Sequence, residues 1–176
     1  YTVDKVTENH ENTGSLSSLL VNRAGSWHLW EPFSVRQQGH DRIQRNLYKN
    51  IPGTTVIFEE VNQDLGLTYR YAWRTGDQFG FIKTTWLIND ASTACTVELL
   101  DGLQNLLPAN ISSGTQNIFS VLLDAYKRSE LDPQTGLGIF ALSSKLTDLA
   151  EPSESLRATT VAQVGLEGGD ILLSTQ

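Results

Sequence analysis

Residues 54–108 decide the fold, and they read TTVIFEEVNQDLGLTYRYAWRTGDQFGFIKTTWLINDASTACTVELLDGLQNLLP. In the middle of this stretch, large apolar residues occupy every second position, namely Leu67, Tyr69, Tyr71 and Trp73. A period of two places their side chains on one face of a β-strand. Turn residues at 75–78 and 89–92 separate this strand from others that are rich in β-branched and aromatic residues. The stretch therefore predicts an antiparallel meander with an apolar face that another layer must cover.

Strand and helix patterns continue on both sides of the meander. We expect further strands at residues 1–7, 41–51, 137–146, 156–166 and 171–174, and we leave 17–21 open between a short strand and a helical turn. One helix is predicted over residues 115–128, with Ser113 as its N-cap and Gln116 completing a capping box. Its apolar stripe, at helical spacing, consists of Ile118, Val121, Leu122 and Ala125, and Phe119, Leu123 and Tyr126 widen it. We expect this stripe to cover one face or end of the sheet.

The strand signals outnumber the helix signal, and strands do not alternate with helices as a parallel sheet would require. We therefore predict a mainly β protein, an antiparallel β-sandwich with one inserted helix. A chain of 176 residues fits a single domain over 1–176 with a sizeable core. Because the chain begins with Tyr and contains no Met, we expect it to be a fragment or the N-terminal domain of a larger protein.

The composition argues against several classes of protein. The net charge of −7 disfavours a nonspecific nucleic-acid surface, which needs clustered Lys and Arg. No apolar run is long enough to span a bilayer, so we expect a soluble protein, with the cytoplasm and the periplasm both left open. The single cysteine, Cys95, excludes an internal disulfide and, inside a strand pattern, indicates a small buried apolar residue.

No motif for a metal ion, a cofactor or an activated nucleophile is present. His10, His28 and His40 are too far apart in the sequence for a metal-ligand spacing. No Gly-x-Ser-x-Gly occurs, and Gly136 and Gly138 open onto a strand, where a phosphate-binding loop would open onto a helix. We therefore expect neither a metal ion nor a cofactor.

Carboxylates are the next candidates, because glycoside hydrolysis uses two of them across the scissile bond. Glu59 and Glu60 are neighbours in a strand, so they point to opposite faces and cannot act together. Glu31, Asp41 and Asp101 lie near strand ends, where a cleft can form. The alternative interpretation, which we favour, makes them solvated surface or capping carboxylates.

Aromatic and planar polar residues gather at residues 26–42, SWHLWEPFSVRQQGHDR. Such groups suit carbohydrate recognition, because sugar rings stack on aromatic faces and sugar hydroxyls bond to planar polar groups. The candidate carbohydrate-binding residues are Trp27, His28, Trp30, Glu31 and Arg36. The same side chains can instead anchor a long loop, and this alternative stays open. Trp73 and Trp86, inside the meander, are interpreted as packing residues.

Residues 50–108 resemble the N-terminal β-supersandwich domain of cellobiose-phosphorylase-like carbohydrate-active proteins. The matching features are an extended strand, an aromatic strand, and the segment TTWLINDASTACTVELLDGLQNLLP, in which an Asn-containing turn joins two strands. In that family a galactose-mutarotase-like sandwich precedes an (α/α)₆ barrel, and the barrel holds the catalytic acid. The resemblance, which extends over residues 27–166, implies a supersandwich fold and transfers no catalytic residue to this chain.

The resemblance implies a non-catalytic domain of a larger carbohydrate-processing protein. Such a domain packs on a downstream helical catalytic domain, assists carbohydrate binding, or forms a homo-oligomer. We expect the chain alone to be no enzyme, with carbohydrate and a helical domain as its partners and neither nucleic acid nor membrane. One alternative is a mutarotase-type sugar epimerase, in which His28 or His40 acts with Glu31. Another is a free-standing carbohydrate-binding module built on Trp27 and Trp30.

Overall fold

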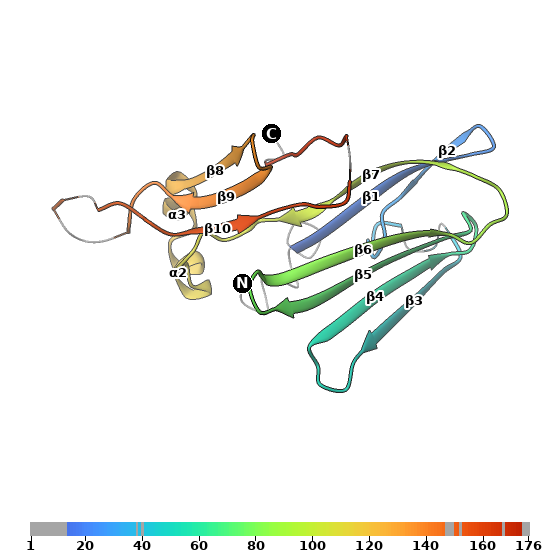
Figure 1. Ribbon diagram of the computed structural model, residues 1–176, viewed down its shortest axis with the longest axis horizontal. Helices are drawn as coiled ribbons and strands as arrows, with labels where there is room; N and C mark the ends of the chain where they lie inside the picture. Colours follow the sequence, from blue (N-terminus) through green and yellow to red (C-terminus); the bar gives the residue numbers. More distant parts are fainter. Residues whose placement is uncertain are drawn as a thin grey trace. The chain divides into compact units, whose positions relative to one another are not determined.

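The computed structural model describes residues 14–37, 39, 41–146, 150–151, 153–166 and 168–173. The protein is mainly β, as the sequence predicts, and short helices interrupt the strands late in the chain (Figure 1). Contacts between residues divide it into two compact units. The sandwich unit spans Ser15–Gly102, and the helix-bearing unit contains the chain from Leu103 onward. Each unit has at least one sheet and buried side chains of its own. The single domain expected over residues 1–176 stays a prediction.

Consecutive strands form a four-stranded antiparallel sheet in the sandwich unit. In spatial order they are β3 (Ile43–Lys49), β4 (Thr55–Asn62), β5 (Leu67–Gly76) and β6 (Gly80–Asn89). The register places Tyr69 of β5 opposite Glu60 of β4 and Leu87 of β6. The predicted meander is thereby confirmed, and its alternating residues Leu67 and Tyr69 are buried on one face, as the period of two requires.

The other sheet of this unit has three strands, in the order β2-β1-β7. They are β1 (Gly14–Arg23), β2 (Ser26–Trp30) and β7 (Thr96–Gln104). A two-residue turn joins β1 to β2, and both of its residues, Ala24 and Gly25, have positive φ angles (52° and 84°). This conformation matches the twist of a tight hairpin, so residues 26–30 fold back along β1 as a strand instead of the loop that we expected. The segment 17–21, left open above, is part of a strand.

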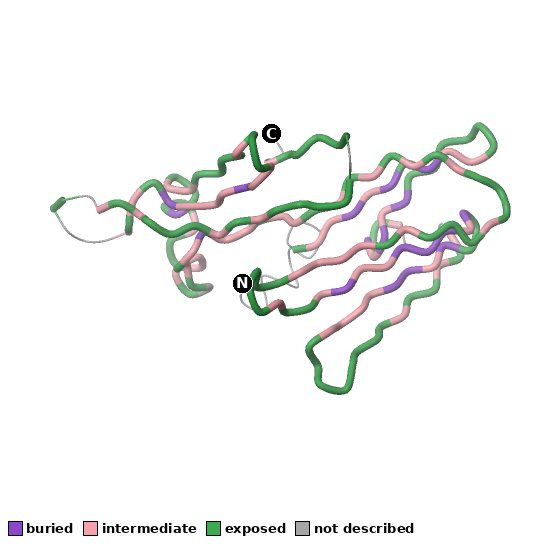
Figure 2. Tube along the Cα trace, in the orientation of Figure 1, coloured by how far each residue is buried: buried purple, intermediate pink, exposed green. Residues whose placement is uncertain are grey.

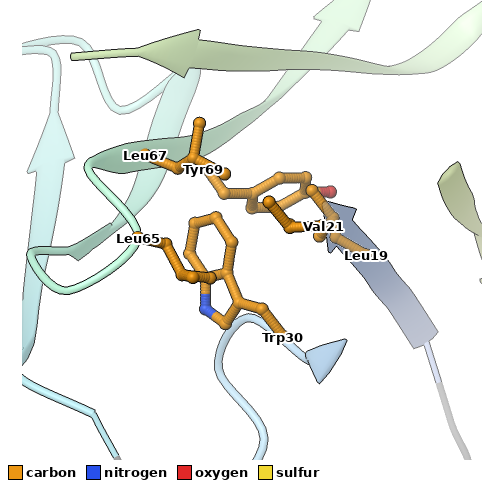
Figure 3. Packing of buried hydrophobic residues seen from close by; sticks show 6 residues of the cluster. All are labelled: Leu19, Val21, Trp30, Leu65, Leu67 and Tyr69. Carbon is orange, nitrogen blue, oxygen red and sulfur yellow. The ribbon is translucent and has the colours of Figure 1, made fainter. Parts of the chain in front are cut away.

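The core of the sandwich unit contains buried side chains from β1, β2, β5 and the turn before β5. These are Leu19, Val21, Trp30, Leu65, Leu67 and Tyr69 (Figure 3). The rings of Trp30 and Tyr69 meet edge to face, with centroids 6.4 Å apart, which is a favoured geometry for aromatic pairs. Cys95 is partly buried against this core. Figure 2 shows buried and less buried positions following one another along the strands, as expected for a sheet with one covered face.

The helix-bearing unit has a smaller sheet and few buried apolar side chains. Its strands, in the order β10-β9-β8, are β8 (Lys127–Asp132), β9 (Leu137–Leu142) and β10 (Ala158–Val161), with α2 (Ser113–Ile118) and α3 (Ser120–Tyr126) before them. Among the described residues of this unit, the buried hydrophobic side chains are Leu123 and Leu142. Many of its other large apolar residues are therefore exposed.

The prediction of one helix over residues 115–128 is wrong in two respects. The helix is broken at Phe119, which has a non-helical backbone (φ −121°, ψ 34°), and β8 begins at Lys127. The N-cap is Ser112 and not Ser113, since the Ser112 hydroxyl accepts a hydrogen bond from Thr115 N at 3.0 Å. Pairing of residues 127–132 with β9 outweighs the helical pattern of the sequence. The predicted N-cap lies one residue after the observed one.

The buried residue of α3 belongs to the predicted widening of the stripe and not to its centre. Leu123 is fully buried, whereas Leu122 is 46% exposed and Val121 more so.

We expect Leu123→Ala to lower the free energy of unfolding by about 2–3 kcal/mol. This is the lower part of the range for a buried Leu, because the few side chains around it can collapse into the space. Leu122→Ala should cost about 0.5 kcal/mol. Urea unfolding of the two variants measures the difference. A larger loss in Leu122→Ala than in Leu123→Ala would show that Leu122 is the buried residue.

The strands predicted at the two ends of the chain are not observed among the described residues. Residues 171–173 form no strand, and the expected edge strand at 1–7 lies outside the described residues. Within the part of the chain that is described, each helix is too short to cross a membrane.

Candidate functional site

The predicted carbohydrate-binding residues do not form one site. Trp30 is 1% exposed, and its Nε1 donates a hydrogen bond to Glu60 Oε1 at 2.8 Å. Trp27 is 49% exposed and, three positions away on the same strand, lies on the opposite face of β2. The two rings therefore cannot stack on one ligand. Trp30 anchors the segment, which is the alternative that the sequence left open.

Glu60 fixes the start of the loop that follows β2. Its carboxylate is buried, and besides the bond from Trp30 it accepts hydrogen bonds at Oε2 from Phe33 N (2.8 Å) and Arg45 Nε (2.7 Å). Arg45 also donates from Nη2 to the Ser34 carbonyl at 3.1 Å. A buried carboxylate is stable only when its charge and its acceptors are matched in this way. Glu60 is thus a structural clamp between the loop and the sheet.

A polar cleft lies beside this clamp. It has a volume of about 360 Å³, and its lining residues are Glu31, Ser34, Gln37, Gly39, Asp41, Ile43, Arg45 and Glu60. Gln37 shapes its wall by accepting a hydrogen bond from Glu31 N (2.8 Å) and donating one to the Leu29 carbonyl (2.9 Å). The structure therefore brings Glu31 and Asp41 to one cleft, as the sequence suggested, while Asp101 lies elsewhere. Of the other candidates, His28 and Arg36 do not line the cleft, and His40 lies outside the described residues.

A second polar cluster, centred on Asp101, joins the two sheets of the sandwich unit. Asp101 Oδ1 accepts hydrogen bonds from Ser17 Oγ (2.6 Å), Lys83 Nζ (2.5 Å) and Tyr69 OH (3.0 Å), and Oδ2 accepts one from Thr85 Oγ1 (2.9 Å). Ser17 and Tyr69 are also hydrogen-bonded to each other. The side chains of Lys83 and Asp101 are 11% and 16% exposed, so the ion pair is largely withdrawn from water. Each group bonds to its neighbours, which is the arrangement of a structural network.

The ionisation states in this cluster follow from burial and from the ion pair. Burial raises the pKa of Asp101, but hydrogen bonds from Lys83 and Ser17 and the Lys83 charge outweigh it, so that the pKa of Asp101 is lowered overall. Burial raises the pKa of Tyr69 above its ordinary value, and the Asp101 charge adds to the effect. The same causes raise the pKa of Tyr71 to about 12. At neutral pH Asp101 is therefore a carboxylate, and the hydroxyls of Tyr69 and Tyr71 keep their protons.

Sequence reasoning missed this cluster, although a signal was present. In β7, Asp101 is two residues from Leu99 and four from Val97, so it shares their inward face. In β6, Lys83 shares the face of Thr85, which is two residues away and directly opposite Tyr71. A charged residue at an inward position of each of two strands predicts a pair if the strands belong to facing sheets. The sequence did not show that β7 leaves the meander for the other sheet.

A third cluster surrounds Glu59, on the face of the four-stranded sheet that points away from the core. Glu59 Oε1 accepts hydrogen bonds from Asn46 Nδ2 (2.8 Å) and Tyr48 OH (2.9 Å), and Oε2 accepts from Arg70 Nε (2.8 Å) and from Arg70 Nη2. Burial raises the pKa of Glu59, but the hydrogen bonds from Arg70, Asn46 and Tyr48 lower it overall. The prediction that Glu59 and Glu60 point to opposite faces is confirmed by these separate sets of partners.

None of the three clusters has the composition of a metal site. Among the described residues, no group of at least three His, Cys, Asp or Glu side chains is placed to hold a metal ion.

Comparisons with known proteins add no family to this picture. No protein-family model matches the chain, and no curated protein shows significant similarity to it. The resemblance to cellobiose-phosphorylase-like domains therefore rests on the sequence features described above and stays a hypothesis.

Proposed function

We propose that this chain is a non-catalytic β-sandwich domain of a larger carbohydrate-processing protein and that it packs against a helical catalytic domain. The carbohydrate class comes from the resemblance of residues 50–108. The observation that carries the packing role is a set of exposed apolar side chains on α2 and α3 and at the break between them. These are Ile118, Phe119, Val121 and Leu122. Contiguous apolar residues on a surface mark a contact with another protein surface more often than isolated ones do.

The state of the buried carboxylates supports the non-catalytic part of the proposal. Asp101, Glu59 and Glu60 each accept at least three hydrogen bonds from neighbouring side chains or backbone, which engages both carboxylate oxygens. A general acid or base must instead be free to reach a substrate proton. Glu60 does line the cleft, but both of its oxygens already accept hydrogen bonds from Trp30, Phe33 and Arg45. Among the residues that the structure describes, which do not include His40, no histidine lines the cleft with the remaining carboxylates, Glu31 and Asp41.

The packing role predicts that the isolated chain associates with itself through the apolar residues of the helices. We expect its mass, measured by light scattering across a wide dilution series, to rise with concentration. Val121→Asp together with Leu122→Asp should reduce this association by placing charge on the contact surface, with little loss of stability because both positions are exposed. Leu156→Asp is a matched control, since Leu156 is an exposed leucine outside the helices. A monomer at every concentration would count against the packing role.

Activity assays complete the test of the proposal. We expect the isolated chain neither to hydrolyse nor to phosphorolyse glycosides, and not to interconvert sugar anomers. Mutarotation well above the buffer rate that is lost in His28→Ala or His40→Ala would instead establish the mutarotase-type alternative, in which a histidine acts with Glu31.

A further inference from the structure

The outer face of the four-stranded sheet presents side chains that the core does not use. Register pairs place Asn46, Glu59, Arg70 and Trp86 in one row across β3, β4, β5 and β6. Tyr48 lies two residues further along β3, on the same face, and donates its hydroxyl to Glu59. We call these five residues the aromatic face.

Glu59 holds the polar members of the aromatic face in fixed positions. Although it lies on an outer face, it is only 5% exposed, and its partners Asn46, Tyr48 and Arg70 surround its carboxylate. Arg70 uses Nε and Nη2 for Glu59, and its Nη1 has no hydrogen-bond partner among the described residues. A donor that is already held in place loses less conformational entropy when it binds a ligand. The face is therefore preorganised to bond to acceptors from solvent or from a ligand.

The two rings of the aromatic face are open to solvent. Tyr48 is 47% exposed and Trp86 is 41% exposed, so Trp86 is not the packing residue that its place in the meander predicts. They lie on the two outermost strands, β3 and β6, which are three strand spacings or about 14 Å apart. Glu59 of β4 and Arg70 of β5 lie between those strands, and Asn46 lies on β3 next to Glu59. The arrangement is a shallow platform with an aromatic group at each side and planar polar groups in the middle.

The chemistry of the platform favours an uncharged, hydroxyl-rich ligand. Glu59 and Arg70 neutralise each other, so the middle of the platform offers hydrogen bonds without a net charge. An apolar protein surface would remove water from Arg70 and Asn46 without supplying acceptors, which is costly. A nucleic acid would be repelled by the net charge of −7. Sugar rings, in contrast, offer apolar faces to aromatic side chains and hydroxyls to the planar groups.

We propose that the aromatic face binds a chain of neutral sugars, with sugar rings on Trp86 and Tyr48 and sugar hydroxyls bonded to Arg70 and Asn46. The inference rests on the proposed function for its ligand class, carbohydrate, and adds the site. This site is separate from the segment 27–36, where the sequence pattern predicts carbohydrate binding. It explains why two large rings stay exposed beside an ion pair of which only the Glu59 carboxylate is buried.

Affinity electrophoresis of the intact chain in gels containing mixed-linkage β-glucan, xylan or soluble starch tests the proposal. We expect the chain to be retarded by at least one of these polysaccharides. Trp86→Ala should weaken that binding by about tenfold or more, because an aromatic anchor is lost. Trp86→Phe, which keeps a ring, should retain most of it, and Tyr48→Ala should weaken binding independently. Urea unfolding of each variant shows whether it is folded.

Trp27→Ala is the matched control, since Trp27 is about as exposed as Trp86 but lies on the other sheet of the unit. Its binding should equal that of the unmodified chain. Binding that is lost in Trp27→Ala and kept in Trp86→Ala would overturn the inference while leaving a carbohydrate-related function in place. Absence of retardation in all three gels would also overturn it, whereas the packing role of the helices is decided separately by light scattering.

Discussion

Trp30→Ala is expected to lower the free energy of unfolding by about 3–5 kcal/mol, the range for truncating a buried Trp. Two losses add up at this position. The indole ring leaves a cavity beside Tyr69 and Leu65, and Glu60 loses the donor at its Oε1 while it stays buried. Urea unfolding measured by circular dichroism gives the difference. Trp27→Ala, at an exposed position on the same strand, should cost about 0.5 kcal/mol.

Trp30→Phe separates the two losses. It keeps an aromatic ring but has no N–H, so it should fall between the unmodified chain and Trp30→Ala, with about 1–3 kcal/mol due to the unsatisfied carboxylate. If Trp27→Ala proved as destabilising as Trp30→Ala, the assignment of Trp30 as the anchor of the loop would be wrong.

Asp101→Ala is the second substitution for which we expect a large effect, about 3–5 kcal/mol. It leaves the Lys83 ammonium without its counter-charge in a site from which water is largely withdrawn, and it removes the acceptor shared by Ser17, Tyr69 and Thr85. Adding Lys83→Met removes the uncompensated charge, so the double variant should be more stable than Asp101→Ala alone. A double-mutant cycle built with Lys83→Met measures the coupling between the two residues. Strictly additive effects would show that the pair contributes nothing.

The lowered pKa of Asp101 gives this contribution a defined pH dependence. Because the pKa of the folded state lies below the ordinary value of 3.8, the stabilisation is fully present above that value. It is lost as the pH falls through the lower pKa of the folded state. The free energy of unfolding should therefore decrease less steeply with acidification in Asp101→Asn than in the unmodified chain. Equal slopes in the two proteins would contradict the lowered pKa.

The sequence was most informative where a local period determines the structure. The alternation of Leu67, Tyr69, Tyr71 and Trp73 predicted the central sheet, and adjacency alone showed that Glu59 and Glu60 serve different faces. Both conclusions need only the two-residue repeat of a strand. The helix was less predictable, because residues 127–132 carry a helical pattern but gain more from pairing with β9. A break at Phe119 has no local signal such as Pro or Gly.

The candidate sites depended on contacts between residues far apart in the chain. Trp30 is buried because Glu60, thirty residues later, accepts its N–H, whereas Trp86 is exposed because its side of β6 faces away from the core. Both residues are tryptophans in strands, so composition cannot distinguish them. Only the pairing register and the assignment of each strand to a sheet decide which ring packs and which is open.

The order of the strands along the chain has a consequence for how the sandwich unit assembles during synthesis. The pairs β3–β4, β4–β5 and β5–β6 join neighbouring segments, so this sheet can form as soon as its strands emerge. β1 is made first but pairs on one side with β7, which is made last in this unit. Until β7 arrives, one edge of β1 has no partner, and open edges of this kind are where nascent chains associate wrongly. We therefore expect the late closure of β7 against β1 to be the slow step of assembly, and the nascent chain to be most prone to aggregation in the interval before it.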